Sequence, residues 1–403
     1  MNDDEEQKLD IQELKLERVK VISVLGRGAK GVVFLVRDNE TGELWAMKAI
    51  SRHFVEEKIH DGRSEYRRVC FEQRVLSSFD HLLLPRLHRV LVTDKIVGYA
   101  IDYCPGRDLN YLRKKQSEKM FADDLIRFYA AEMVLALEYL HNQGIVYRDL
   151  KPENIMIQEN GHIMLVDFDL STKLSSKSGQ SSPNHSSVNT TPDSPRQKHL
   201  SVHCNSVISP GDSTSCSGRS SNYSARADWD LAEKSNSFVG TEEYVAPEII
   251  LGNGHDFAVD WWSLGVVLYE MLYGTTPFRG SNRNDTFSRI LKKQPDLVGE
   301  ATPLRDLIRK LLEKDPKQRI GLDRIKGHDF FRRVDWDRVV EISRPPYIPL
   351  DDEVEEQGGD TDGIHQIDVE LFVQGLFAGD VVENIKVNDK ITDNHETETF
   401  LVF

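Results

Sequence analysis

The order of the hydrophobic patterns along the chain constrains its fold most strongly. Apolar residues alternate in short runs from Val19 to Tyr103, as in β-strands, and helical spacing dominates after the turn Cys104-Pro-Gly106. A β-rich segment followed by an α-rich segment predicts an α+β chain with two lobes. We place the small lobe at residues 19–103 and the large lobe at 104–331.

The small lobe should contain five strands and one helix. The strands are V-K-V-I-S-V-L, G-V-V-F-L-V-R and L-W-A-M-K-A-I from Val19 on, followed by runs around Arg89–Val92 and Val97–Tyr103, and the helix covers Glu65–Phe79. In the large lobe, helices are expected at Asp123–Asn142 and at Asp260–Tyr273. The second is almost wholly apolar and should therefore be buried.

Three polar segments interrupt or flank these lobes. We expect residues 1–18 to be disordered, and residues 171–236, with 19 serines and four Ser/Thr-Pro pairs, to form a disordered insertion. A tail at 332–403 follows, polar over Leu350–Thr399 and ending in the apolar run Phe400-Leu-Val-Phe403. Four apolar residues cannot form a core alone, so this end should dock in a pocket on a folded domain.

Composition and charge exclude several classes of protein. The net charge is −15, but Leu350–Thr399 holds 15 acidic residues and two lysines, so the main body is nearly neutral. The chain has no basic excess for nucleic acid and no run near the ~18 apolar residues of a membrane span. The acidic start is unlike a secretory signal or transit peptide. Four cysteines without a C-x-x-C pair argue against a disulfide scaffold or zinc ribbon and fit a reducing compartment (Cys70, Cys104, Cys204 and Cys216).

A glycine-rich run, Gly26-Arg-Gly-Ala-Lys-Gly31, stands between two expected strands. Such a hairpin lets backbone amides approach phosphate oxygens, although an ordinary hairpin explains the run equally well. Lys48, one strand later, can pair with phosphate or lie on a solvated face. Glu72, on the following helix, can hold this lysine in place or be a surface charge.

The run Tyr147-Arg-Asp-Leu-Lys-Pro-Glu-Asn154 carries the most chemistry. Asp149 can accept a hydroxyl proton, Lys151 can neutralise a transferring phosphate, and Asn154 can bind a metal through its amide oxygen. Asp167, the first residue of Asp-Phe-Asp169, can bind Mg²⁺.

With Gly240-Thr-Glu-Glu-Tyr-Val-Ala-Pro-Glu248 and Asp260-Trp-Trp, these elements stand in the order of the protein-kinase signatures. From Val21 to about Phe331 the chain therefore resembles a eukaryotic-type serine/threonine protein kinase. The paired tryptophans and the terminal F-x-x-F resemble the AGC group. Asp169 in place of glycine and the long segment before Glu248 resemble its plant subgroup VIII, above all the oxidative-signal-inducible kinases.

This resemblance implies the bilobal protein-kinase fold, with ATP and Mg²⁺ as cofactors. It implies catalytic roles for Asp149, Lys151 and Asn154, and metal binding by Asn154 and Asp167. Lys48 would contact phosphates and pair with Glu72, and Glu248 would pair with Arg319. The implied ATP-binding residues are Leu25, Gly26, Arg27, Gly28, Ala29, Lys30, Gly31, Val32, Val33, Ala46, Lys48, Glu72, Ile101, Asp102 and Cys104.

The resemblance also implies regulation and partners. Ser237 would carry an activating phosphate that pairs with Arg148. The acidic residues Asp108, Glu153 and Glu270 would read basic residues of protein substrates. Phe400 and Phe403 would dock on the chain's own small lobe or on a phosphoinositide-dependent protein kinase.

Two further expectations concern the insertion and the setting. The Ser/Thr-Pro pairs suggest input from proline-directed (MAP) kinases. The expected location is the cytoplasm, with the nucleus or a peripheral place at the plasma membrane as alternatives, and the expected setting is stress or defence signalling. A competing interpretation is a non-catalytic scaffold that binds through the insertion and the tail. Asp169 bears on it, because aspartate tolerates fewer backbone conformations than the usual glycine.

Overall fold

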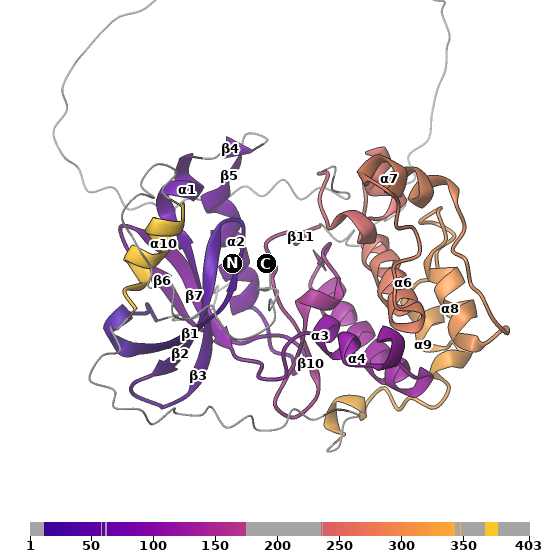
Figure 1. The fold of residues 1–403 in the computed structure, drawn as a ribbon, viewed down its shortest axis with the longest axis horizontal. Coiled ribbons are helices and arrows are strands. Elements are labelled where there is room, and N and C mark those ends of the chain that lie inside the picture. Colours follow the sequence, from indigo (N-terminus) through magenta and orange to yellow (C-terminus); the bar gives the residue numbers. More distant parts are fainter. Residues whose placement is uncertain are drawn as a thin grey trace, which may run out of the picture. The chain divides into compact units, whose positions relative to one another are not determined.

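The small lobe is built on a five-stranded antiparallel sheet in the order β1-β2-β3-β7-β6 (Figure 1). Two glycines are required by close packing between its strands. A Cβ on Gly98 would lie 1.9 Å from the Lys48 carbonyl oxygen, and one on Gly31 would lie 2.4 Å from the Ala49 carbonyl oxygen. The strands are β1 (Val19–Arg27), β2 (Gly31–Asp38), β3 (Leu44–Ser51), β6 (Leu87–Val92) and β7 (Ile96–Asp102).

Helix α2 (Glu65–Ser77) is the expected helix of the small lobe, and it buries Val69, Glu72 and Val75 on one face. Before it come a short helix and two short strands that the sequence patterns did not indicate, because each has six residues or fewer. They are α1 (Arg52–Glu57), β4 (Ile59–His60) and β5 (Arg63–Ser64).

The large lobe is helical around α4 (Asp123–Asn142) and α6 (Ala258–Tyr273), as the spacing predicts. Helix α6 is buried along nearly its whole length and ends at Gly274, whose φ of 72° is left-handed. The other helices are α3 (Leu109–Lys114), α5 (Pro247–Leu251), α7 (Arg283–Lys292), α8 (Pro303–Leu311) and α9 (Leu322–Lys326). The short strands pair as β8 (Ile145–Val146) with β11 (Thr172–Lys173), and β9 (Ile155–Ile157) with β10 (Ile163–Leu165).

The computed structural model describes residues 12–57, 59–60, 63–174, 235, 237–342, 347 and 367–377, without the side chains of 57–64. The α+β prediction with a β-rich and a helical lobe is confirmed. In the described part of the chain, no helix combines the length and the apolar character that crossing a bilayer requires. Most of the expected serine-rich insertion lies outside the described residues, but residues 171–174 and Ser235 are paired with the large lobe.

Two polar segments contribute more to the small lobe than their sequences suggested. The predicted disorder over residues 1–18 is wrong for its last part, because Leu14 is buried and its amide donates to the Val90 carbonyl. Within the polar tail, helix α10 (Val369–Phe377) packs on the small-lobe sheet (Figure 1), with Val373 fully buried.

Candidate active site

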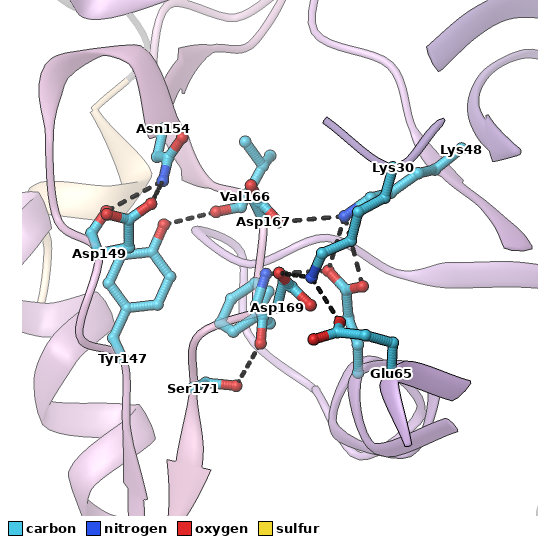
Figure 2. A network of polar contacts seen from close by, with 12 residues as sticks. Lys30, Lys48, Glu65, Tyr147, Asp149, Asn154, Val166, Asp167, Asp169 and Ser171 are labelled. Carbon is cyan, nitrogen blue, oxygen red and sulfur yellow. Dashed lines mark hydrogen bonds and ion pairs between the residues drawn. The ribbon is translucent and has the colours of Figure 1, made fainter. Parts of the chain in front are cut away.

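The Asp149 carboxylate is held by neighbouring polar side chains, among them Asn154 (Figure 2). Its Oδ1 accepts a hydrogen bond from the Thr241 hydroxyl at 2.8 Å, and its Oδ2 accepts one from Asn154 Nδ2 at 2.9 Å. Lys151 Nζ lies 3.0 Å from Oδ2. The structure therefore brings the three predicted catalytic residues together, and it adds Thr241, to which the sequence assigned no role.

The backbone around this carboxylate is held in an unusual conformation. Arg148 has a φ of 70° and Asp167 a φ of 58°, both in the left-handed region that residues with a Cβ rarely adopt. The buried Asp260 carboxylate accepts the amides of Tyr147 and Arg148 at 2.9 and 2.8 Å. Such strain persists where the surroundings over-determine it, so Asp260 helps to fix the loop that carries Asp149, the predicted catalytic loop.

Lys48 bridges helix α2 and Asp167. Its Nζ lies 3.2 Å from Glu72 Oε1 and 3.1 Å from Asp167 Oδ1, so the ion pair predicted with Glu72 is present. Burial alone would lower the pKa of Lys48, but the charges of Asp167 and Glu72 outweigh it and raise that pKa well above its ordinary value. Burial likewise opposes ionisation of Asp167, yet Lys48 brings the pKa of Asp167 below its usual range. The lysine is thus a fixed positive charge.

Asn154 and Asp167 fit a magnesium ion. The Asn154 side-chain amide donates to Asp149, while its Oδ1 is buried without a hydrogen-bond partner. A buried oxygen of this kind normally has a partner, so an unfilled one indicates a missing donor or cation. Together with the Asp167 carboxylate it provides the hard oxygen ligands that Mg²⁺ prefers beside substrate phosphates.

The glycine-rich run forms the turn between β1 and β2, next to the strand that carries Lys48. Of the predicted residues, Leu25 to Arg27 end β1, Gly28 to Lys30 form the turn, and Gly31 to Val33 begin β2. Val33 pairs directly with Lys48 across β2 and β3. The amides of the turn and the lysine therefore belong to one continuous piece of sheet.

The remaining predicted ATP-binding residues, Ala46, Ile101, Asp102 and Cys104, lie at the end of this sheet or just after it. Ala46 pairs with Ile101 between β3 and β7, and Cys104 is buried against Met164 and Val166. Burial raises the pKa of the Cys104 thiol, which therefore stays protonated and belongs to the packing.

Asp102 is used differently from its neighbours, because its carboxylate accepts from the Arg86 amide and contacts His88 Nε2, both at 2.8 Å. It braces the end of β7 through its side chain.

The segment before Gly240 is anchored on Arg148. Arg148 Nη1 donates to the Ser237 hydroxyl at 2.7 Å and to the Ser235 hydroxyl at 2.9 Å. Ser235 also pairs with His255 through two backbone hydrogen bonds. Arg148, the predicted partner of Ser237, is therefore in place, and the structure also puts Ser235 within hydrogen-bond distance of the same guanidinium.

The three acids expected to read substrate differ in their surroundings. Asp108 is 2% exposed and caps helix α3 by accepting the Tyr111 amide at 2.7 Å. Glu270 is buried against Arg113, 2.9 Å away, and accepts the Tyr244 hydroxyl. Glu153 is half-buried and bonded to the Asn110 side chain at 2.9 Å. Asp108 and Glu270 therefore already serve the fold.

Two further predictions concern the frame around the site. The predicted pair of Glu248 with Arg319 is present as a buried, two-pronged ion pair with distances of 2.7 and 3.0 Å. Phe400 and Phe403 lie outside the described residues, so their docking stays a prediction.

Comparisons with known proteins agree with this geometry. The family model of the protein kinase domain matches residues 19–201 and 220–331. The chain is 60% identical to serine/threonine-protein kinase OXI1 of Arabidopsis thaliana, over 96% of this chain and 93% of that protein. It is 41% identical to serine/threonine-protein kinase UCN of Arabidopsis thaliana, over 84% of this chain and 86% of that protein. It is 40% identical to phototropin-1A of rice, over 86% of this chain and 35% of that longer protein.

Proposed function

The chain belongs to the protein kinase family and is a serine/threonine kinase of the AGC type, and we propose that it uses ATP as donor with Mg²⁺ held by Asn154 and Asp167. The observation that carries this is the pair of adjoining networks around Asp149 and Lys48. One presents a carboxylate to a hydroxyl, and the other fixes a positive charge beside a metal-binding carboxylate.

Asp149 orients the acceptor hydroxyl and takes its proton. Its Oδ1 already accepts the hydroxyl of Thr241 at 2.8 Å, which shows that an alcohol fits against this oxygen. Lys151, 3.0 Å from the other oxygen, offers a positive charge to the phosphate. When bound, Mg²⁺ would neutralise negative charge on the phosphate oxygens.

A phosphotransfer assay with Asp149→Asn tests the enzyme against the scaffold. The full-length chain and this variant would be compared with Mg·ATP and a generic serine peptide. We expect incorporation by the wild type to exceed that by the variant at least about a hundredfold, because general-base catalysis contributes 10²–10⁴-fold. Equal and negligible incorporation by both proteins favours the scaffold.

The proposal includes regulation by the segment that contains Ser237 and precedes Gly240, here called the activation segment. A phosphate on Ser237 adds nearly two negative charges beside the Arg148 guanidinium, which lies 2.7 Å from the serine oxygen. Arg148 directly precedes Asp149, so pairing with that phosphate orders the catalytic loop and the segment together. Phosphorylation of Ser237 thus activates the enzyme.

The proposal extends to substrates and partners. Glu153 is the acid with spare accepting capacity, so it would read basic residues ahead of the phosphorylated serine or threonine, with Asp108 and Glu270 shaping the surface. Phe400 and Phe403 would recruit a phosphoinositide-dependent protein kinase, and proline-directed kinases would act on the Ser/Thr-Pro pairs.

The proposed setting is stress or defence signalling from the cytoplasm, with the nucleus or the periphery of the plasma membrane as alternatives. The similarity to serine/threonine-protein kinase OXI1 supports the kinase activity on which this setting depends.

A further inference from the structure

A second lysine bridges helix α2 and the segment at Asp167. Lys30, in the turn of the glycine-rich hairpin, places its Nζ 2.7 Å from Asp169 Oδ2 and 2.8 Å from Glu65 Oε2 (Figure 2). Glu65 is buried, and the side chains of Lys30 and Asp169 are 27% and 21% exposed. Burial opposes the charge on Lys30, but Asp169 and Glu65 raise its pKa above the ordinary value. Ion pairs so little exposed are only weakly screened by salt.

This bridge repeats the plan of the one at Lys48. Glu65 and Glu72 lie two turns apart on α2, and hence on one face of the helix. The two bridges end on the same three-residue run, Asp167–Asp169. They differ in the origin of the lysine, since Lys48 comes from strand β3 and Lys30 from the hairpin turn. The second bridge therefore ties that turn to the two elements that fix Lys48.

The bridge also explains Asp169, which stands where the related signature has glycine. A glycine would offer Lys30 no carboxylate and leave Glu65 as its partner. Asp169 does not have a positive φ, unlike Asp167 two positions earlier. Its backbone therefore accommodates a side chain without left-handed strain. The aspartate thus adds an ion pair without a conformational penalty at its own backbone.

We propose that Asp169 and Glu65 are positioning residues for phosphoryl transfer, which act through Lys30 to hold the glycine-rich turn over the phosphate site. The inference rests on the proposed use of Mg·ATP. The turn, Gly28 to Lys30, has small residues at its first two positions, and a loop of this kind is mobile unless it is tied down. Held in place, its amides stay near the phosphates. The lysine also offsets the negative charge of Asp169, which would otherwise repel ATP, and it shares Glu65 with Arg68.

The test measures Mg·ADP binding by calorimetry, together with KM for ATP and kcat, on the full-length chain. Asp169→Asn keeps the volume of the side chain but removes its charge. We expect it to weaken nucleotide binding and raise KM about threefold to tenfold, the range of coupled neighbours, with a smaller change in kcat.

Lys30→Met should weaken binding further, because it removes the ion-pair partner of Asp169 and leaves Glu65 with Arg68 alone. The double variant Lys30→Met/Asp169→Asn should therefore bind nucleotide better than Lys30→Met alone. Lys30→Arg should restore binding, since it keeps the charge. Lys20→Met, an equivalent change at an exposed position in β1, is the control and should match the wild type.

The proposal would be overturned if Asp169→Asn bound Mg·ADP as tightly as the wild type. It would also be overturned if the losses of affinity in the double variant were purely additive. A gain of activity in Asp169→Asn would overturn it as well, because the bridge would then restrain the enzyme. If the wild type binds Mg·ADP but transfers no phosphate, the proposed function fails, and the binding measurements still decide this inference.

Discussion

At the scale of single residues, charges in the site are fixed by their partners. Lys48, Asp167 and Glu72 form one chain of ion pairs, and Lys151 and Asn154 hold Asp149. Their residue types and order were readable from the sequence. The partners Thr241 and Asp260 were not assigned, since each lies about a hundred positions from the catalytic loop and only the fold brings it there.

Lys48→Met should remove phosphotransfer and leave the chain folded. The charge that orients the phosphates is lost, while methionine keeps much of the length of the side chain. We expect kcat/KM to fall at least about a hundredfold, or ~2.7 kcal/mol of barrier, in a peptide assay, with Lys20→Met as the control. Retention of more than about a tenth of the activity contradicts the role given to Lys48.

His255 should make stability depend on pH. Burial, and then the neighbouring Arg148, lower its pKa to about 4, against the opposing influence of Glu248, Asp260 and Asp256. The unfolded chain therefore binds the proton more readily between about pH 6.5 and 4, and stability falls as the pH is lowered through that window.

Urea unfolding of wild type and His255→Asn from pH 7.5 to 4.5 measures this effect. The difference in unfolding free energy between the two proteins should shrink on acidification by on the order of 2 kcal/mol. Parallel curves would show that His255 does not carry the dependence.

At the scale of elements, long periodic segments were predictable and short or isolated ones were not. The strands around Lys48 and the helices α2, α4 and α6 follow directly from their apolar spacing. Helix α10 was missed because its apolar residues stand in a strongly acidic tail and become a helix by packing on the sheet. The Lys30 bridge was missed because its members belong to three elements.

Helix α10 should stabilise the small lobe through its buried face. Val373 is fully buried there, whereas Leu371, on the same helix, is 61% exposed. Val373→Ala should cost about 1–3 kcal/mol of stability, and Leu371→Ala should stay within ~0.5 kcal/mol. Thermal unfolding of both variants is the measurement. Equal shifts would mean that α10 does not stabilise through this face.

Activation by phosphorylation should depend on Ser237 rather than on Ser235, although Arg148 contacts both hydroxyls. Ser237 stands three residues before Gly240 and four before Thr241, which contacts Asp149. A phosphate on Ser237 would therefore couple Arg148 to the part of the chain next to Asp149. After treatment with an upstream kinase, Ser237→Ala should be at least about tenfold less active, ~1.4 kcal/mol. Ser235→Ala should keep wild-type activity. The reverse ranking would move the phosphosite to Ser235.

At the scale of the whole molecule, the site joins segments distant in the sequence. Strand β3, the catalytic loop and the run at Asp167 supply the charges, while the segment at Thr241 closes over Asp149 from beyond the serine-rich stretch. Both sides of that stretch are attached to the large lobe, through Leu174 on Gly144 and through Ser235 on His255. These attachments explain how a long insertion is compatible with an assembled site.

The most direct test of the proposed use of Mg·ATP on serine and threonine is a peptide-library phosphorylation profile of the full-length chain. We expect phosphate on serine and threonine, with a preference for peptides that carry arginine or lysine upstream. The Glu153→Gln variant should weaken that preference and keep the choice of serine and threonine. Phosphate on tyrosine, or no incorporation above that of Asp149→Asn, would contradict the central claim.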